Sequence, residues 1–313
     1  RVGDAVMNQF PWLTVIGLIP LLGALVLWLV PAAGARAKEI ALGASVVTLL
    51  VAIAAALQFK TSGAVKFQLV EQHAWIPQFG VSYALGVDGI ALSLILMSVI
   101  LVPICLLAAW RDLPAEESGR ERHYFALMLV LETFMVGVFA ATDVFLFYVF
   151  FEAMLIPVYF LIGQFGGPRR QYAAMKFLLF SLAGGLIMLA AVIALYMQGP
   201  GGADGFLVTK LTGLPLTEST ERLIFLGFFL AFAVKAPMVP VHTWLPDAAA
   251  ESRPATATLL VGVLDKVGTY GMIRFCLELF PGASAWATPV VIVFALVSII
   301  YCALLAIGQK DLM

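Results

Sequence analysis

Hydrophobic residues along the 313-residue chain gather in long stretches separated by short polar segments. A helix needs about 20 mostly apolar residues to cross the roughly 30 Å hydrocarbon core of a bilayer. Nine stretches have that length: residues 11–30, 39–58, 89–110, 124–141, 144–165, 172–197, 223–247, 255–280 and 286–308. Only helices suit apolar runs this long, so the pattern predicts an all-α polytopic membrane protein with about nine transmembrane helices.

The seventh stretch, residues 223–247, is longer than a membrane requires and carries Pro237, Pro240 and Pro246. Each proline lacks a backbone N–H and so deprives the carbonyl four residues earlier of its helical partner. Interrupted helices at membrane depth are tolerated where they are buried in protein or line a hydrated cavity. We therefore expect a discontinuous helix with its break at Pro237 and Pro240.

Two longer loops, residues 59–88 and 198–222, separate these helices, and an alternating segment that begins at Lys66 favours a β-hairpin in the first loop. Basic loop residues predict the orientation, because cytoplasmic loops are enriched in Lys and Arg. Nine lie on one side and five on the other: Arg36, Lys38, Arg111, Arg120, Arg122, Arg169, Arg170, Arg253 and Lys310 against Arg1, Lys60, Lys66, Lys210 and Arg222. This excess predicts an N-terminus outside the cell.

Composition excludes two classes of protein. The chain is 62% hydrophobic and 12% charged, whereas soluble domains are about 45–50% apolar and about 25% charged. A net charge of −1 offers no basic patch for nucleic acid. We therefore expect the lipid bilayer, and no nucleic acid, as a partner.

Cysteines and histidines are few and lie far apart along the chain. They are Cys105, Cys276, Cys302, His73, His123 and His242. Their spacing does not match an iron–sulfur, haem or zinc motif. We expect this chain to bind no metal and no cofactor, so any redox chemistry takes place elsewhere.

Three charged residues lie near the middle of apolar stretches: Glu152 in the fifth, Lys235 in the seventh and Lys266 in the eighth. Each such charge costs about 2.5–3.5 kcal/mol at the centre of a membrane helix and is therefore a functional candidate. A glutamate and a lysine on different helices can form a static ion pair that only fixes packing. The proline break beside Lys235 instead favours a hydrated, ionisable site on a proton pathway.

Weaker candidates accompany these three. His242 follows Lys235 in the broken segment and is expected either to relay protons or to donate to carbonyls freed by the prolines. Glu132 in the fourth stretch is expected by default to pair with a neighbouring helix, with a proton role as the alternative.

Charges near the ends of the stretches predict structural roles. We expect Asp143 and Asp247 to cap helices and fix loops, and Lys176 to extend its ammonium to the membrane surface. Arg274 and Glu278, four residues apart, are expected to form an ion pair on one helix.

Four segments carry a family resemblance: residues 85–90 (LGVDGI), 143–157 (DVFLFYVFFEAMLIP), 235–247 (KAPMVPVHTWLPD) and 264–271 (LDKVGTYG). They resemble the subunit M family of antiporter-like membrane subunits in proton-pumping NADH:quinone oxidoreductase, respiratory complex I, whose mitochondrial counterpart is subunit 4. The resemblance runs from about residue 75 to the end of the sequence. The broken-helix segment is highly specific to this superfamily.

The resemblance implies a fold of fourteen helices with two inverted five-helix repeats. This chain would then comprise helices 1–3 with the hairpin loop in residues 1–123, the first repeat of helices 4–8 in residues 124–280, and helix 9 in residues 281–313. The sequence begins with Arg1 and stops in a polar segment after Gly308. We therefore expect it to be a truncated piece of a longer protein.

By resemblance, Glu152, Lys235 and Lys266 match the family's proton-pathway residues. Asp265, directly before Lys266, departs from the family pattern and joins His242 and Glu132 as a possible relay residue. The family is a non-redox, proton-translocating part of an enzyme in the bacterial plasma (inner) membrane. NADH, FMN, iron–sulfur clusters and quinone belong to partner subunits, and other antiporter-like subunits are neighbours.

Two further functions stay open. A subunit of a multisubunit Mrp-type cation/proton antiporter shares these segments without electron transfer. A purely scaffolding membrane subunit would need none of the buried charges.

Overall fold

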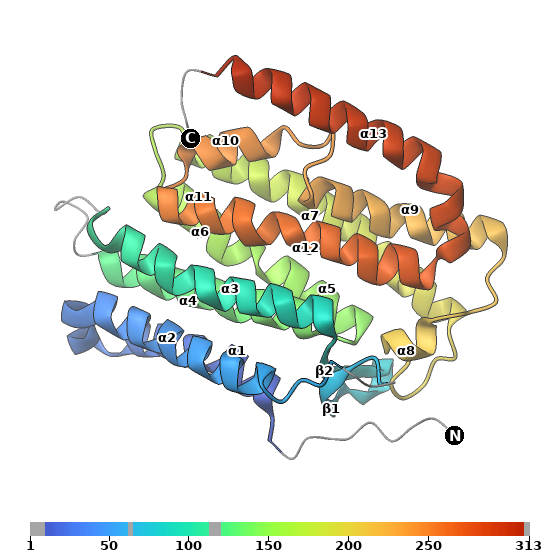
Figure 1. Cartoon of the computed structure of the whole chain (residues 1–313), viewed down its shortest axis with the longest axis horizontal. Coiled ribbons are helices and arrows are strands. Elements are labelled where there is room, and N and C mark those ends of the chain that lie inside the picture. Colours follow the sequence, from blue (N-terminus) through green and yellow to red (C-terminus); the bar gives the residue numbers. More distant parts are fainter. Residues whose placement is uncertain (1–9, 62–64, 113–119, 310–313) are drawn as a thin grey trace.

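A computed structural model describes residues 10–61, 65–112 and 120–309. Its helices lie side by side with roughly aligned axes, and a β-hairpin covers one end of the bundle (Figure 1). Among these described residues, seven helical segments have the length and apolar composition needed to cross a membrane: Trp12–Leu29, Pro31–Ala56, Gly89–Arg111, Glu121–Ala140, Val144–Phe165, Arg170–Gln198 and Pro281–Ile307. The chain is a multi-pass membrane protein, as its apolar stretches predict.

The first four helices form one side of the bundle. They are α1 (Trp12–Leu29), α2 (Ala37–Ala56) after the short η1 (Pro31–Arg36), α3 (Gly89–Ala108), which ends in η3 (Ala109–Arg111), and α4 (Glu121–Ala140). Helix α4 packs against α1, α2 and α3, and almost all its side chains beyond the first turn are buried. This central position explains why α4 is apolar around its whole circumference.

The remaining helices include several interrupted ones. They are α5 (Val144–Ala153), α6 (Leu155–Phe165), α7 (Arg170–Gln198), the short α8 (Val208–Leu211), α9 (Glu218–Lys235), α10 (Trp244–Glu251), α11 (Pro254–Leu259), α12 (Asp265–Gly271) and α13 (Pro281–Ile307). Two π-helical segments, η5 (Leu260–Leu264) and η6 (Met272–Leu277), flank α12. The predicted seventh helix is thus α9 and α10 separated by residues 236–243, and the eighth runs from α11 to η6.

The predicted hairpin in the first long loop is present. Strand β1 (Gln68–Ile76) pairs antiparallel with β2 (Val81–Val87) through the turn η2 (Pro77–Phe79). Glu71 of β1 accepts hydrogen bonds from the backbone N–H groups of Leu13, at 2.6 Å, and Thr14, at 3.2 Å. The carboxylate therefore satisfies amides at the N-terminus of α1 that no helical carbonyl reaches.

The charges at helix ends have mostly the structural roles expected of them. Asp143 caps α5 by accepting from the N–H of Leu146 at 2.9 Å, which confirms the predicted cap. Arg274 pairs with Glu278 at 3.4 Å, as predicted, and also with Asp88 at the start of α3, at 2.7 Å.

Lys176 has a partner that the sequence did not predict. Its ammonium lies 2.7 Å from Asp247 of α10, and its expected extension to the membrane surface stays a prediction. The interruption of the seventh helix turns α10 back against α7, and this brings a carboxylate within reach of the amine. Asp247 thus fixes the segment after the break, as expected for loop fixation.

Replacing Glu71 with alanine should destabilise the bundle, because the α1 amides then lose their acceptor in a partly buried site. We expect the free energy of unfolding to fall by about 1–2 kcal/mol. The measurement is thermal unfolding of the full-length protein in detergent, with Glu39→Ala, an exposed carboxylate at the start of α2, as the control. Equal melting temperatures for both variants would contradict the capping role.

Candidate functional site

Three of the predicted ionisable residues come together in the middle of the bundle. Glu152 lies in the last turn of α5, Lys235 is the last residue of α9, and Asp265 is the first residue of α12. Lys235 is only 2% exposed and lies within electrostatic range of both carboxylates. Among the described residues, its Nζ, Oε1 of Glu152 and Oδ1 of Asp265 are buried and have no hydrogen-bond partner.

Aromatic rings rather than hydrogen-bond acceptors surround the ammonium of Lys235. Its Nζ lies 4.9 Å from the ring centroid of Phe151 and 5.7 Å from that of Phe177. A desolvated cation over a ring face gains about 2 kcal/mol, which offsets only part of the cost of burying the charge. The arrangement leaves the three N–H donors available to a small polar molecule such as water.

The helix break after Lys235 satisfies its own backbone. The carbonyl of Ala233, which lost its partner at Pro237, accepts from the N–H of Met238 at 2.9 Å. The indole N–H of Trp244 donates to the carbonyl of Val234, at 2.9 Å. The predicted break is confirmed, and these hydrogen bonds make it a defined structure rather than a frayed end.

Helix α13 lies over this break (Figure 1). The N–H of Val239 donates to Oγ of Ser298 at 3.0 Å, and the ring of His242 meets that of Tyr301 edge to face at 5.4 Å. In the described part of the chain, Nδ1 of His242 has no hydrogen-bond partner. The carbonyl of His242 accepts instead from Leu245 at 3.0 Å.

A second interruption lies beside Glu152 and was not predicted. Helix α5 ends at Ala153, one residue after Glu152, and α6 begins at Leu155. Pro157 removes the N–H that would bond to the carbonyl of Ala153. Pro157 follows Glu152 by five residues, as Pro237 follows Lys235 by two. This proline could have predicted the interruption from the sequence.

Glycines make room for the buried charges. A Cβ on Gly185 of α7 would overlap with the carboxylate of Glu152, so the absence of a side chain creates the space for that group. On α12, a Cβ on Gly268 would lie 2.6 Å from the backbone N of Ala236 and 2.7 Å from the carbonyl O of Phe232. Helix α12 therefore packs directly on the backbone around Lys235.

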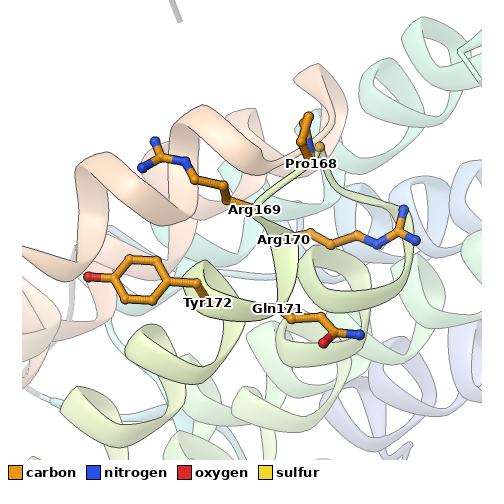
Figure 2. A pocket seen from close by; sticks show the side chains of 6 residues that line it. Pro168, Arg169, Arg170, Gln171 and Tyr172 are labelled. Carbon is orange, nitrogen blue, oxygen red and sulfur yellow. The ribbon is translucent and has the colours of Figure 1, made fainter.

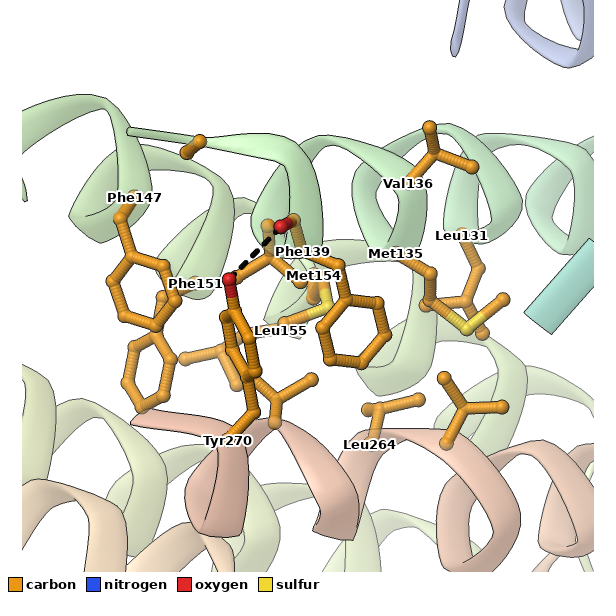
Figure 3. Close-up of a cluster of buried hydrophobic side chains, with 14 of the residues drawn as sticks. Leu131, Met135, Val136, Phe139, Phe147, Phe151, Met154, Leu155, Leu264 and Tyr270 are labelled. Atoms are coloured by element: carbon orange, nitrogen blue, oxygen red, sulfur yellow. Dashed lines mark hydrogen bonds between the residues drawn. The ribbon is translucent and has the colours of Figure 1, made fainter. Parts of the chain in front are cut away.

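An aromatic cluster fills the bundle between the buried charges and the hairpin end. It consists of rings in mutual contact on α5, α9 and η6: Phe147, Phe151, Phe228, Phe232 and Phe275. Apolar side chains of α4 and η5 extend it, and the hydroxyl of Tyr270 on α12 donates to the carbonyl of Phe139 at 3.0 Å (Figure 3). The charges thus lie between this cluster on one side and the break on the other.

Two predicted candidates are not part of the Glu152–Lys235–Asp265 group as the structure describes it. Lys266 is exposed, although its neighbour Asp265 is buried, and it interacts electrostatically with that aspartate. Glu132 on α4 is completely buried, and neither oxygen has a hydrogen-bond partner among the described residues. The default expectation that Glu132 pairs with a neighbouring helix was therefore wrong.

Ser181 of α7 was missed in the sequence. Its hydroxyl is buried without a partner in the described part of the chain, one turn after Phe177 and one turn before Gly185. The residue thus shares a helix face with the ring near Lys235 and with the glycine near Glu152. A single serine in an apolar stretch does not indicate a site by itself, because the side chains that surround it in space depend on how the helices pack.

A surface pocket at the start of α7 is separate from these charges. Its lining is Gly167, Pro168, Arg169, Arg170, Gln171 and Tyr172 (Figure 2). The N–H of Arg169 donates to the carboxylate of Glu251 at 2.8 Å, so this loop holds the end of α10. Within the described residues there is no cluster of three or more His, Cys, Asp or Glu side chains suited to a metal.

Two family models match the chain. Residues 41–138 match "NADH-ubiquinone oxidoreductase chain 4, amino terminus", and residues 141–313 match the transmembrane family "NADH:quinone oxidoreductase/Mrp antiporter". The second model covers more than half of the chain. The chain belongs to the NADH:quinone oxidoreductase/Mrp antiporter family.

Relatives within this family are similar along almost the whole chain. The NADH-quinone oxidoreductase subunit M of Mycobacterium tuberculosis is 47% identical, across 98% of this chain and 62% of the relative. In the solved structure of respiratory complex I from Thermus thermophilus with bound NADH, one chain is 32% identical, with a TM-score of 0.83 over 96% of this chain and 60% of that one. A chain of the Mrp complex from Dietzia, 22% identical with a TM-score of 0.74, shares the fold.

The chain spans about 60% of the length of these subunit M and complex I relatives.

Adding a methyl group at Gly185 should disturb this site, because it must displace the carboxylate of Glu152 or separate α5 from α7. Overpacking of this kind costs typically about 1–3 kcal/mol. We expect Gly185→Ala to lower the melting temperature of the full-length protein. Gly43→Ala in α2, where a Cβ meets no atom within 4 Å, is the matched control and should not lower it. Unchanged stability of Gly185→Ala would show that the space is not filled by Glu152.

Proposed function

We propose that this chain is a proton-translocating membrane subunit, of the subunit M type, of a proton-pumping NADH:quinone oxidoreductase in a bacterial plasma membrane. One observation carries the proposal: a fully buried lysine without hydrogen-bond partners ends a broken helix beside a glutamate on a second interrupted helix. The similarity to subunit M supports the same assignment.

The unpartnered atoms favour a mobile proton over a static ion pair. A buried pair that only fixes packing repays its desolvation through a direct, well-aligned hydrogen bond. Lys235 and Glu152 attract each other but share no hydrogen bond. A changing distance between such groups changes the proton affinity of both, because their interaction is strong at low dielectric constant.

The surroundings of the pair support a directional path. The aromatic cluster separates the charged pair from the hairpin end of the bundle. At that end, the N–H of Ser82 on β2 donates to the carboxylate of Asp143, which caps the start of α5. On the opposite side, residues 236–243 follow Lys235 with irregular backbone, which at membrane depth is typical of protein-lined hydrated cavities. We propose that protons reach Glu152 and Lys235 from the side of the break.

The other candidate residues have secondary roles in the proposed proton path. Lys266 continues the path from the centre, His242 lines the break, and Glu132 is a buried carboxyl beside the main route. The three-part division at residues 124 and 281, nine membrane crossings and an outside N-terminus belong to the same proposal. This chain translocates protons and performs no redox step, whereas partner subunits bind NADH, FMN, iron–sulfur clusters and quinone.

An Mrp-type antiporter subunit is the second candidate function, since the Dietzia Mrp chain shares the fold. The match of residues 41–138 to a chain 4 amino-terminal model favours the oxidoreductase. Co-purification of the full-length protein with flavin and iron–sulfur subunits would support the oxidoreductase. A stable complex without them would support the antiporter.

Replacing Glu152 with glutamine removes the titrating group and nearly preserves the shape. We expect the assembled complex to oxidise NADH while pumping few or no protons per electron through this subunit, measured as proton uptake into membrane vesicles. Glu218→Gln, at the exposed start of α9, is the control and should pump normally. Normal pumping by a fully assembled Glu152→Gln complex would remove Glu152 from the path.

Replacing Lys235 with arginine separates charge from titration, because guanidinium keeps its proton at any working pH. If Lys235 carries the proton, Lys235→Arg should assemble and lose most pumping. If Lys235 is only a static counterion, Lys235→Arg should be tolerated. Lys235→Ala should then lower the stability of the subunit by about 3–5 kcal/mol, because it leaves Glu152 buried and unpaired. Assembled amount is measured together with pumping, and full pumping by assembled Lys235→Arg would contradict the proposal.

A further inference from the structure

Asp265 is a second carboxylate near Lys235. It lies on α12, whereas Glu152 lies on α5. It is 8% exposed, and its Oδ1 is buried without a hydrogen-bond partner in the described part of the chain. An orphaned carboxylate oxygen in an apolar interior is costly unless it has a charge partner or water. Such an atom therefore calls for a functional explanation.

The packing of α12 directs Asp265 at the end of α9. Gly268, one turn later on the same face of α12, lies against the backbone at Phe232 and Ala236, the two residues that bracket the last turn ending at Lys235. Asp265 is accordingly within electrostatic range of Lys235, and also of Lys266 next to it.

The π-helical segment directly before Asp265 determines which neighbour faces inward. A π segment contains an extra residue per turn, and this rotates the residues that follow relative to a regular α-helix. In the resulting register Asp265 is buried and Lys266 is exposed. The carboxylate thus lies between the buried lysine on α9 and the exposed lysine on its own helix.

We propose that Asp265 accepts the proton that Lys235 releases and so forms the step from α9 to α12. The N–H bond of the Lys235 ammonium breaks as an O–H bond forms on the Asp265 carboxylate, which leaves a neutral amine and a carboxylic acid. The amine then takes a proton from the Glu152 carboxyl, which becomes a carboxylate. Asp265 then gives its proton to the neutral amine form of Lys266, directly or through water, and becomes a carboxylate again.

This inference rests on the proposed proton path through Glu152 and Lys235, and it assigns the acceptor that follows them. Two carboxylates on different helices, α5 and α12, lie within electrostatic range of one amine, so Lys235 can exchange partners. Proton movement from α5 to α12 then uses the flexible side chain of Lys235.

The test is Asp265→Asn in the full-length complex, with Asp265→Glu as the conservative variant and Glu152→Gln in parallel. Asparagine has the same shape but cannot take up a proton, so we expect assembly and NADH oxidation with most pumping lost. Glutamate should restore pumping. If Glu152→Gln stops pumping while Asp265→Asn pumps normally, the inference is wrong and the proposed function stands. If both pump normally, the proposed function itself is wrong.

Infrared difference spectra of the working complex supply a readout that a merely structural role would not change. The C=O band of a transiently protonated carboxyl should disappear in Asp265→Asn and shift in Asp265→Glu. This comparison also decides the case in which Asp265→Asn fails to assemble, because Asp265→Glu keeps the charge. Identical carboxyl bands in the wild type and Asp265→Glu would overturn the proposal.

Discussion

The arrangement depends on one unfavourable burial, that of the Lys235 ammonium at the end of α9 without a hydrogen-bond partner in the described residues. Removing an ammonium from water costs several kcal/mol even after relaxation. The surrounding structure offsets this cost with the carboxylates of Glu152 and Asp265 and with the ring of Phe151. None of these contacts fixes the proton in a single hydrogen bond, so the site combines stability of the charge with freedom to move it.

Helix interruptions make this burial possible. Lys235 and Glu152 each lie at a helix end near a proline, and Asp265 directly follows a π-helical segment. Irregular backbone would be costly in lipid, but here the Trp244 indole, the N–H of Met238 and helix α13 satisfy or cover it. The helix interruptions thus lie where the buried charges meet.

Much of this organisation was predictable, because lipid imposes strict length and polarity rules on the chain. Apolar stretches predicted the helices, and Pro237 predicted the break. Register and long-range pairing were not predictable. The ion pair between Lys176 and Asp247 depends on how α10 returns after the break, and the burial of Asp265 instead of Lys266 depends on one extra residue in a π segment. These features arise from tertiary packing, which local composition does not encode.

The most direct test of the account is a structure of the complete assembly at a resolution that shows ordered water around Lys235. A water that bridges two polar groups is nearly as favourable as a direct hydrogen bond and connects groups that do not touch. The account predicts water within hydrogen-bond distance of both Nζ of Lys235 and Oε1 of Glu152, continuing towards residues 236–243. A dry, direct hydrogen bond between ammonium and carboxylate in every state, with no water in reach of either, would contradict it.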